Sequence, residues 1–379
     1  MDKAESINHF RAQILWQERA NMQLMLEREY QLHKEQHANE FIASFLNICQ
    51  EIRHAQSRGE KGRIGYITFS MLRTELMEGR YLYRVEAMDA SWVFDRTPLV
   101  LQYDASWAFQ YLDDFRSKLI EGSRMYAGRV SLPIIEQILL SELLVIHRYI
   151  AELARFSLPR ATELDEYRDI AKEPVFEIRV GEYMDISELV FKVDVRDQES
   201  EQIRTWLDDR EDGGCEHTYE LYRNIDLSEG DFGRIDLRYS QFEQCNLSRC
   251  SLLDSVLLGT RWNETCLAQV DFSRSQIHGA EFRNCDLKGA IFRDAAGASG
   301  WKDARFLDFP ALSALSFTGS DLEGADFTGA SLYGTNFSSA NVKNTLFTGA
   351  DLANAIFSVH QKDVVQLDEQ QWGQTLWKR

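Results

Sequence analysis

Residues 317–357 read FTGSDLEGADFTGASLYGTNFSSANVKNTLFTGADLANAIF, and a large apolar residue stands at every fifth position from Phe317 to Phe357. The same spacing runs from Leu227 to Phe292, so two blocks hold 14 and 9 large apolar residues without a miss. A small residue, usually Ala, Ser or Cys, stands two positions before most of them, and the other positions are mostly polar. A period of five fits neither an α-helix nor a β-strand, so the stretch predicts a repeat architecture.

These residues resemble the pentapeptide-repeat family, whose consensus is A-(D/N)-L-x-x, and the resemblance covers residues 222–358. It implies a right-handed quadrilateral β-helix, a β-solenoid in which four pentapeptides form one coil. The large and the small residue of each repeat would point inward, and coils would stack about 4.7–4.9 Å apart through backbone hydrogen bonds. The expected core side chains include Leu227, Phe232, Leu247, Phe272, Phe292, Phe317, Phe337 and Phe357.

The two blocks differ in phase. Phe tends to alternate with Leu or Ile along each block, and the alternation flips between Phe292 and Phe317, which lie an odd number of pentapeptides apart. If each face of the coil keeps its Phe or Leu identity, then either one or three pentapeptides must leave the coil. We therefore predict an excursion at residues 293–316. The alternative is five degenerate repeats stacked in place, since Leu307 and Leu312 keep the register.

The first part of the chain has a different character. Residues 1–160 predict a mainly α-helical domain that carries a small β-hairpin. Alternating apolar residues from Arg80 to Glu86 predict one strand of this hairpin, and Trp92–Phe94 is the expected partner strand. Helices are expected over residues 3–57, 105–126 and 132–157, the last with Ser131 as its N-cap.

Residues 161–217 are the most acidic segment, with 18 acidic and 7 basic residues. Two alternating runs, residues 176–180 and 189–193, predict a second hairpin, and a short helix and a hinge should follow. We therefore expect an acidic connector at 161–217, the β-solenoid at 218–360 and a C-terminal cap at 361–379. The cap is expected because the open end of a solenoid is a template for further strand pairing.

Composition restricts the possible functions. The net charge of −18 disfavours direct binding of nucleic acid. No signal peptide or apolar span is evident, and the six cysteines form no C-x-x-C pair, so we expect a cytoplasmic protein with buried thiols that act as small hydrophobic groups.

Motifs of known chemistry are absent from the sequence, including phosphate-binding loops, nucleophile elbows and the H-E-x-x-H zinc motif. His33 and His37 are one helical turn apart and could ligate a metal, but with no third ligand evident we expect a solvated helix face. We expect no catalytic residue, no cofactor and no metal.

Three functions remain open. The first is a non-catalytic scaffold or adaptor that presents the solenoid to a partner protein. The second follows from the resemblance, because several family members imitate DNA and bind type II topoisomerases such as gyrase. The third is an enzyme or effector in residues 1–160, with the solenoid as a targeting arm.

A DNA mimic needs dense negative charge, and residues 218–379 hold 21 acids and 15 bases. In the second block the acids are expected to face only Lys343. The candidate partner contacts are Trp301, Lys302, Arg305, Asp321, Glu323, Asp326 and Asp351. A homodimer could form through the N-terminal helix or the C-terminal cap.

Overall fold

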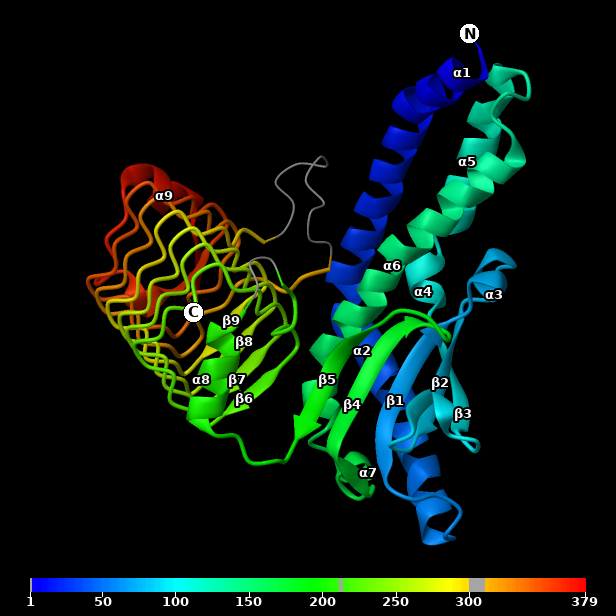
Figure 1. Cartoon of the computed structure of the whole chain (residues 1–379). Coiled ribbons are helices and arrows are strands. Elements are labelled where there is room, and N and C mark those ends of the chain that lie inside the picture. The colour runs from blue at the N-terminus through cyan, green and yellow to red at the C-terminus, as the bar shows by residue number, and fades with distance from the viewer. Residues whose placement is uncertain (1, 211–213, 300–310) are drawn as a thin grey trace. The chain divides into compact units, whose positions relative to one another are not determined.

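A computed structural model describes residues 2–210, 214–299 and 311–379. The chain forms two compact units, which meet in sequence between Val195 and Arg196. The first unit contains the N-terminal helices and a β-sheet, and the second contains the repeats (Figure 1). Ala311 belongs to the first unit, where its amide donates a hydrogen bond of 2.9 Å to the Glu27 carboxylate.

The sheet of the first unit has five strands in the order β3-β2-β1-β4-β5. The strands are β1 (Ile64–Met71), β2 (Leu82–Met88), β3 (Leu99–Asp104), β4 (Lys172–Glu182) and β5 (Ser187–Asp194). All neighbouring strands are antiparallel except β1 and β4, which pair in parallel. The pairing of β1 with β4 joins segments that are far apart in the chain into one sheet.

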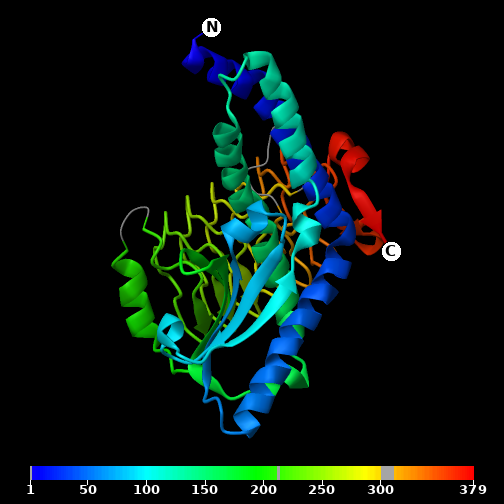
Figure 2. The ribbon, with the colours of Figure 1, turned by 90° about the vertical axis from the view of Figure 1, so that its right-hand side faces the viewer.

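Two long helices, α2 and α6, pack against each other and contact strands of this sheet. Figures 1 and 2 show that α2 extends beyond the sheet, where it runs with α5 and α6. The helices of the unit are α1 (Lys3–Phe10), α2 (Trp16–Ser57), α3 (Arg73–Met77), α4 (Ser106–Phe109), α5 (Leu112–Ser123), α6 (Leu132–Ala161) and α7 (Asp165–Arg168). A π-helical turn, Arg11–Leu15, connects α1 to α2, so the chain is helical from Lys3 to Ser57 as predicted.

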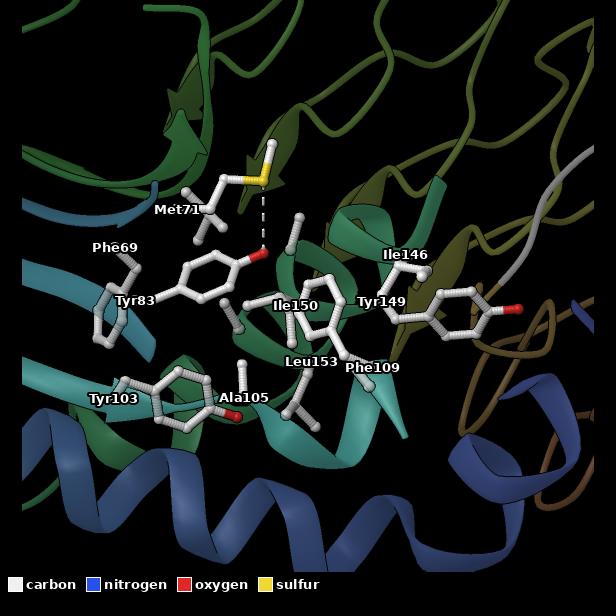
Figure 3. Packing of buried hydrophobic residues seen from close by; sticks show 14 of the residues in the cluster. Phe69, Met71, Tyr83, Tyr103, Ala105, Phe109, Ile146, Tyr149, Ile150 and Leu153 are labelled. Atoms are coloured by element: carbon white, nitrogen blue, oxygen red, sulfur yellow. Dashed lines mark hydrogen bonds between the residues drawn. The ribbon is translucent and has the colours of Figure 1, made fainter. Parts of the chain in front are cut away.

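The core of the first unit lies between the sheet and the helices. Figure 3 shows Phe69, Tyr83 and Tyr103 from the sheet together with Ile150 and Leu153 of α6. All five side chains are buried, so this layer contributes the hydrophobic free energy that folding of the unit requires.

Three expectations about this unit were wrong. Trp92–Phe94 is a 3-10 turn, in which Trp92 has a φ of 52°, and the antiparallel partner of β2 on that side is β3. The small hairpin is instead part of a five-stranded sheet. Residues 161–195 are no separate connector, because β4 and β5 complete that sheet and the unit continues to Val195.

The second unit contains a stack of coils, which we call the repeat region (residues 221–299 and 312–358). Parallel bridges form four columns, which begin at Leu221, Asp226, Asp231 and Asp236. Within each block, a bridge joins two residues that are four pentapeptides apart. One coil therefore takes four pentapeptides. In one column the bridges lengthen into strands, visible in Figure 1: β6 (Leu221–Arg223), β7 (Gln241–Glu243), β8 (Arg261–Asn263) and β9 (Glu281–Arg283).

The bridge spacing changes once. Glu281 pairs with Ser316 and Ala296 pairs with Ser331, an offset of seven pentapeptides in place of four. The added three pentapeptides are one of the two lengths that the alternation of Phe and Leu allows. Within the predicted excursion at 293–316, Ala296 and Ser316 still form bridges of the coil, so its predicted bounds were too wide. Residues 300–310 of that span lie outside the described residues.

The aromatic side chains keep their columns across this change. Phe282 stacks on Phe317 with ring centroids 5.0 Å apart, and Phe292 stacks on Phe327 at 4.6 Å. Equivalent pairs recur along the rest of the region, such as Phe317 on Phe337. The interior thus contains two aromatic columns, one from Tyr222 to Phe357 and one from Phe272 to Phe347, a repeated packing that fixes the register of the coils.

Both ends of the repeat region are covered. At the first coil, Gln198 exchanges two hydrogen bonds with the backbone of Leu221 and Arg223, and Leu207 of α8 (Ser200–Asp208) is buried in the core of the region. At the last coil, Gln361 and Gln371 each donate to two backbone carbonyls at 2.7–3.0 Å. The covering elements are α9 (Glu369–Gln374) and the parallel pair β10 (Ile356–Ser358) and β11 (Leu376–Lys378).

Among the described residues, none of the helices has both the length and the apolar character needed to cross a lipid bilayer.

Candidate functional site

The candidate site is the outer surface of the repeat region, whose shape follows from its turns. In the two blocks, from Leu227 as far as Leu352, the residue two positions after each large apolar residue of the register has a positive φ, for example 61° at Arg234 and 61° at Arg249. In the second block this position is often glycine, which adopts such φ values without steric cost. In the first block it often carries a charged side chain, which is why the two blocks differ in surface chemistry.

Where an Asp or Asn precedes the large apolar residue, its side chain stabilises the turn that follows. The Asp321 carboxylate accepts a hydrogen bond of 3.1 Å from the Glu323 amide, and Asp351 accepts one of 3.2 Å from the Ala353 amide. Asn246 and Asn341 accept the same bond through their side-chain oxygens. These acids are thus part of the turn chemistry, and Asn can replace Asp there without loss of the acceptor.

Bases on neighbouring coils pair with the predicted acids Asp321, Glu323 and Asp326. Lys288 Nζ lies 3.1 Å from Asp321, and Lys343 Nζ lies 3.0 Å from Glu323. Arg293 donates a hydrogen bond of 2.7 Å to Asp326, which is buried. The expectation that these acids face only Lys343 was wrong, because stacking brings Lys288 and Arg293 of the preceding coil beside them.

These contacts affect the acidity of the carboxyl groups. At Asp321, burial acts to raise the pKa, but the Glu323 amide, Lys288 and Asn341 outweigh it, so the pKa lies below its ordinary value. At Asp326 burial is likewise outweighed, by Thr328 and Arg293, and the pKa is again lowered. Both side chains therefore carry a fixed negative charge at neutral pH, opposite a fixed positive one.

The first block shows the same pairing between coils. Arg274 donates two hydrogen bonds, of 2.7 and 2.6 Å, to Asp254, which lies one coil earlier. Arg223 pairs with Glu243 of the next coil at 2.7 Å. Single exposed pairs of this kind contribute little to stability, but a ladder of them leaves a surface on which both signs of charge alternate.

The remaining predicted residues fall in two groups. Trp301, Lys302 and Arg305 lie outside the described residues. The eight expected core side chains are all buried. They are Leu227, Phe232, Leu247, Phe272, Phe292, Phe317, Phe337 and Phe357.

The first unit holds a further cluster of polar side chains, on α2. The carboxylate of Glu29 lies 3.0 Å from His33 Nδ1 and 3.6 Å from His37 Nε2. The ligand atoms of the three residues lie within 4.8 Å of one another, so together they could hold a metal ion. Glu29 was missed at the level of sequence, although its spacing, four residues before His33, places it on the same helical face.

Comparison with known proteins identifies the repeats. The family described as pentapeptide repeats matches residues 263–294, 312–349 and 330–358, with 8 copies. These matches make up less than half of the chain, so the family assignment applies to the repeat region. Comparison with curated protein sequences gives no match.

Several solved structures resemble the repeat region. A trypsin-treated form of QnrB1, a plasmid-mediated fluoroquinolone resistance protein, is 24% identical over 43% of this chain and 72% of its own, with a TM-score of 0.28. A pentapeptide repeat protein of the Arabidopsis thaliana thylakoid lumen is 20% identical over 43% of this chain and 77% of its own, with a TM-score of 0.20. HetL of the cyanobacterium Nostoc, involved in heterocyst differentiation regulation, is 14% identical over 41% of this chain and 95% of its own, with a TM-score of 0.18.

Proposed function

Because the C-terminal part of this chain consists of pentapeptide repeats, we propose that it is a non-catalytic scaffold whose right-handed, four-sided solenoid binds a partner protein. The contact surface is the outer face of the second block, around Asp321, Glu323, Asp326 and Asp351. The free state of all six cysteines fits the cytoplasmic location that we also propose.

The observation that carries this proposal is the regular bridge register. Parallel bridges hold outward side chains one above another in every coil, with one change of spacing. Stacked repeats of this kind create extended and stiff surfaces, which suit recognition of another folded protein because little conformational freedom is lost on binding.

The inward side chains support a role without catalysis. They are aliphatic or aromatic groups, with hydroxyls such as Ser275 and Thr345 that bond to backbone carbonyls. Burial raises the pKa of Cys245 and of Cys250 to about 11, so both thiols remain protonated at neutral pH. Protonated, hydrogen-bonded thiols are poor nucleophiles.

The charge arrangement favours this proposal over the DNA-mimic alternative. A mimic needs unopposed negative charge along its surface, whereas Asp321, Glu323 and Asp326 each face a base of a neighbouring coil. We expect a topoisomerase supercoiling assay to be unaffected by a saturating amount of the protein. Inhibition of supercoiling would favour the alternative.

Affinity capture with two matched variants tests the proposal. The test variant removes charge from the second block through Asp321→Asn, Glu323→Gln, Asp326→Asn and Asp351→Asn. The control variant does the same in the first block through Glu229→Gln, Asp231→Asn, Asp271→Asn and Asp286→Asn. Asn keeps the turn acceptor in both, so the coils should stay folded.

The full-length chain serves as bait in an extract of the cells that naturally produce it. We expect a partner that the native chain and the control variant retain and that the test variant loses. Equal recovery by all three baits would place the contact outside the second block, and recovery of no specific partner would count against a scaffold.

A further inference from the structure

Three potential metal ligands lie on one face of α2 in the first unit. Glu29, His33 and His37 follow one another at intervals of four residues, which successive turns of an α-helix bring to one side. Glu29 Oε1 is 3.0 Å from His33 Nδ1 and 3.6 Å from His37 Nε2. Ligands about 2.0–2.2 Å from a tetrahedral zinc ion lie roughly 3.3–3.5 Å from one another. The two observed distances lie on either side of this range, and all three ligand atoms are within 4.8 Å, so small side-chain adjustments bring them to it.

The state of His37 points to a ligand. Its side chain is only 6% exposed and stacks on Trp107, with ring centroids 4.3 Å apart. Among the described residues, neither ring nitrogen of His37 has a hydrogen-bond partner. Buried polar groups in native proteins are almost always satisfied, and Nε2 faces the Glu29 carboxylate at 3.6 Å, beyond hydrogen-bond distance.

A second carboxylate lies near His37, although beyond hydrogen-bond distance. Glu40 Oε2 lies 3.7 Å from the other ring nitrogen of His37, Nδ1. A histidine that binds a metal commonly directs its second nitrogen to a carboxylate, which fixes the ring.

We infer that Glu29, His33 and His37 form a binding site for a divalent transition-metal ion of the zinc class, with the remaining coordination position open to water or to an external ligand. Two imidazoles and one carboxylate are the donors that such ions take. His33 is 47% exposed, so an ion can enter from solvent. The site does not depend on the proposed role of the repeat region.

The competing explanation is a set of ion pairs between Glu29 and protonated histidines. The two explanations differ in what a metal does. If only ion pairs are present, added zinc should bind no more tightly to this chain than to a variant without the cluster.

The test is isothermal titration calorimetry with zinc. The full-length chain is prepared without a histidine tag and is freed of metal with a chelator. We expect one zinc ion per chain, and we expect Glu29→Gln and His33→Ala each to weaken its binding at least 10-fold. The matched control is Glu51→Gln combined with His54→Ala, because this exposed Glu and His lie further along the same helix. The control should bind zinc like the native chain.

Cobalt substitution gives a second reading that does not depend on affinity. Co²⁺ in a four-coordinate site with two imidazoles has intense visible absorption, and we expect such a spectrum from the native chain and the control but not from His33→Ala. Since His33 is exposed, its replacement should leave the fold intact, which circular dichroism checks. Zinc binding that the three variants share equally, or the absence of zinc binding in the native chain, would overturn the assignment.

Discussion

The hydroxyl of Ser275 donates a hydrogen bond of 2.6 Å to the carbonyl of Leu252, 23 residues earlier, inside the repeat region. The same oxygen accepts a hydrogen bond of 3.0 Å from the Ser255 amide. One buried hydroxyl therefore joins two consecutive coils and satisfies two backbone groups. The Ala280 amide meets no hydroxyl from the next coil. It instead donates a hydrogen bond of 3.1 Å to the carbonyl of Ile277, three residues earlier. This contrast explains why the small position accepts Ser as well as Ala.

Ser275→Ala should destabilise the chain only slightly. The Ser255 amide can then donate to the Leu252 carbonyl, just as the Cys250 amide donates to the Leu247 carbonyl at 3.1 Å. We therefore expect the free energy of unfolding to fall by about 1 kcal/mol. Ser275→Val should cost about 1–3 kcal/mol more, because the position has no room for added methyl groups. Urea denaturation measures both, with Ser338→Ala at a partly exposed turn as the control. Equal stabilities for the Ala and Val variants would contradict this packing.

The side chains of Gly297 and Leu315 have the reverse of the sizes that the repeat pattern predicts for their positions. Gly297 stands where a large apolar residue is expected and Leu315 where a small one is expected, and a Cβ added to Gly297 would overlap the Leu315 side chain. Gly297→Leu should therefore cost about 1–3 kcal/mol through overpacking, and Leu315→Ala about 2–5 kcal/mol through a cavity. The double variant restores the usual pattern and should be more stable than either single one. Additive losses in the double-mutant cycle would refute this reversal of sizes.

His147 should make the stability of the first unit depend on pH. Burial lowers the pKa of His147, and the nearby carboxylates of Glu188 and Glu182 oppose this only in part. The Tyr83 hydroxyl lies 3.0 Å from its Nδ1. Below about pH 6.5 the unfolded chain takes up a proton at His147 that the folded chain does not, so stability is lost as the pH falls from that value toward the folded-state pKa.

Thermal unfolding of the native chain and of His147→Gln checks this effect. Between about pH 7.5 and 5.5 the native Tm should fall more steeply, because Gln cannot titrate but can still bond to Tyr83. Parallel curves for the two proteins would show that His147 does not contribute to the pH dependence.

The six free cysteines should react in a fixed order. Burial raises the pKa of Cys49 and of Cys285 to about 12, whereas Cys215 is exposed. The thiolate is the reactive form, so a maleimide at neutral pH should modify Cys215 first and leave the buried thiols intact until the chain unfolds. Mass spectrometry of peptides after labelling with and without urea identifies the sites. Rapid labelling of Cys49 or Cys285 in the folded chain would contradict their burial.

The repeat region could be predicted because its period is local. Each pentapeptide carries its own inward pair and its own turn acceptor, so Phe317 and Asp321 reveal their positions without knowledge of distant partners. The family match confirms that prediction. The ion pairs between coils were partly missed, because Lys288 meets Asp321 across the changed bridge spacing, which exceeds that of a regular coil.

The sheet of the first unit could not be predicted in the same way. The pairing of β1 with β4 depends on α6, which brings the chain back beside β1 before β4 begins. No local sequence pattern near Ile64 indicates which strand will pair with β1. The strand β3 did have a signal, since Leu99, Leu101 and Tyr103 alternate with more exposed residues. Trp92–Phe94 is short and apolar, and short apolar runs are compatible with either a turn or a strand.

Cross-linking of the captured complex tests the central proposal most directly. The full-length chain is bound to the partner that it retains from extract, treated with a lysine-reactive cross-linker and analysed by mass spectrometry. The scaffold proposal predicts links from the partner to Lys288 and Lys343, which flank the second-block acids. Links confined to lysines of the first unit, such as Lys3, Lys34 and Lys118, would contradict it.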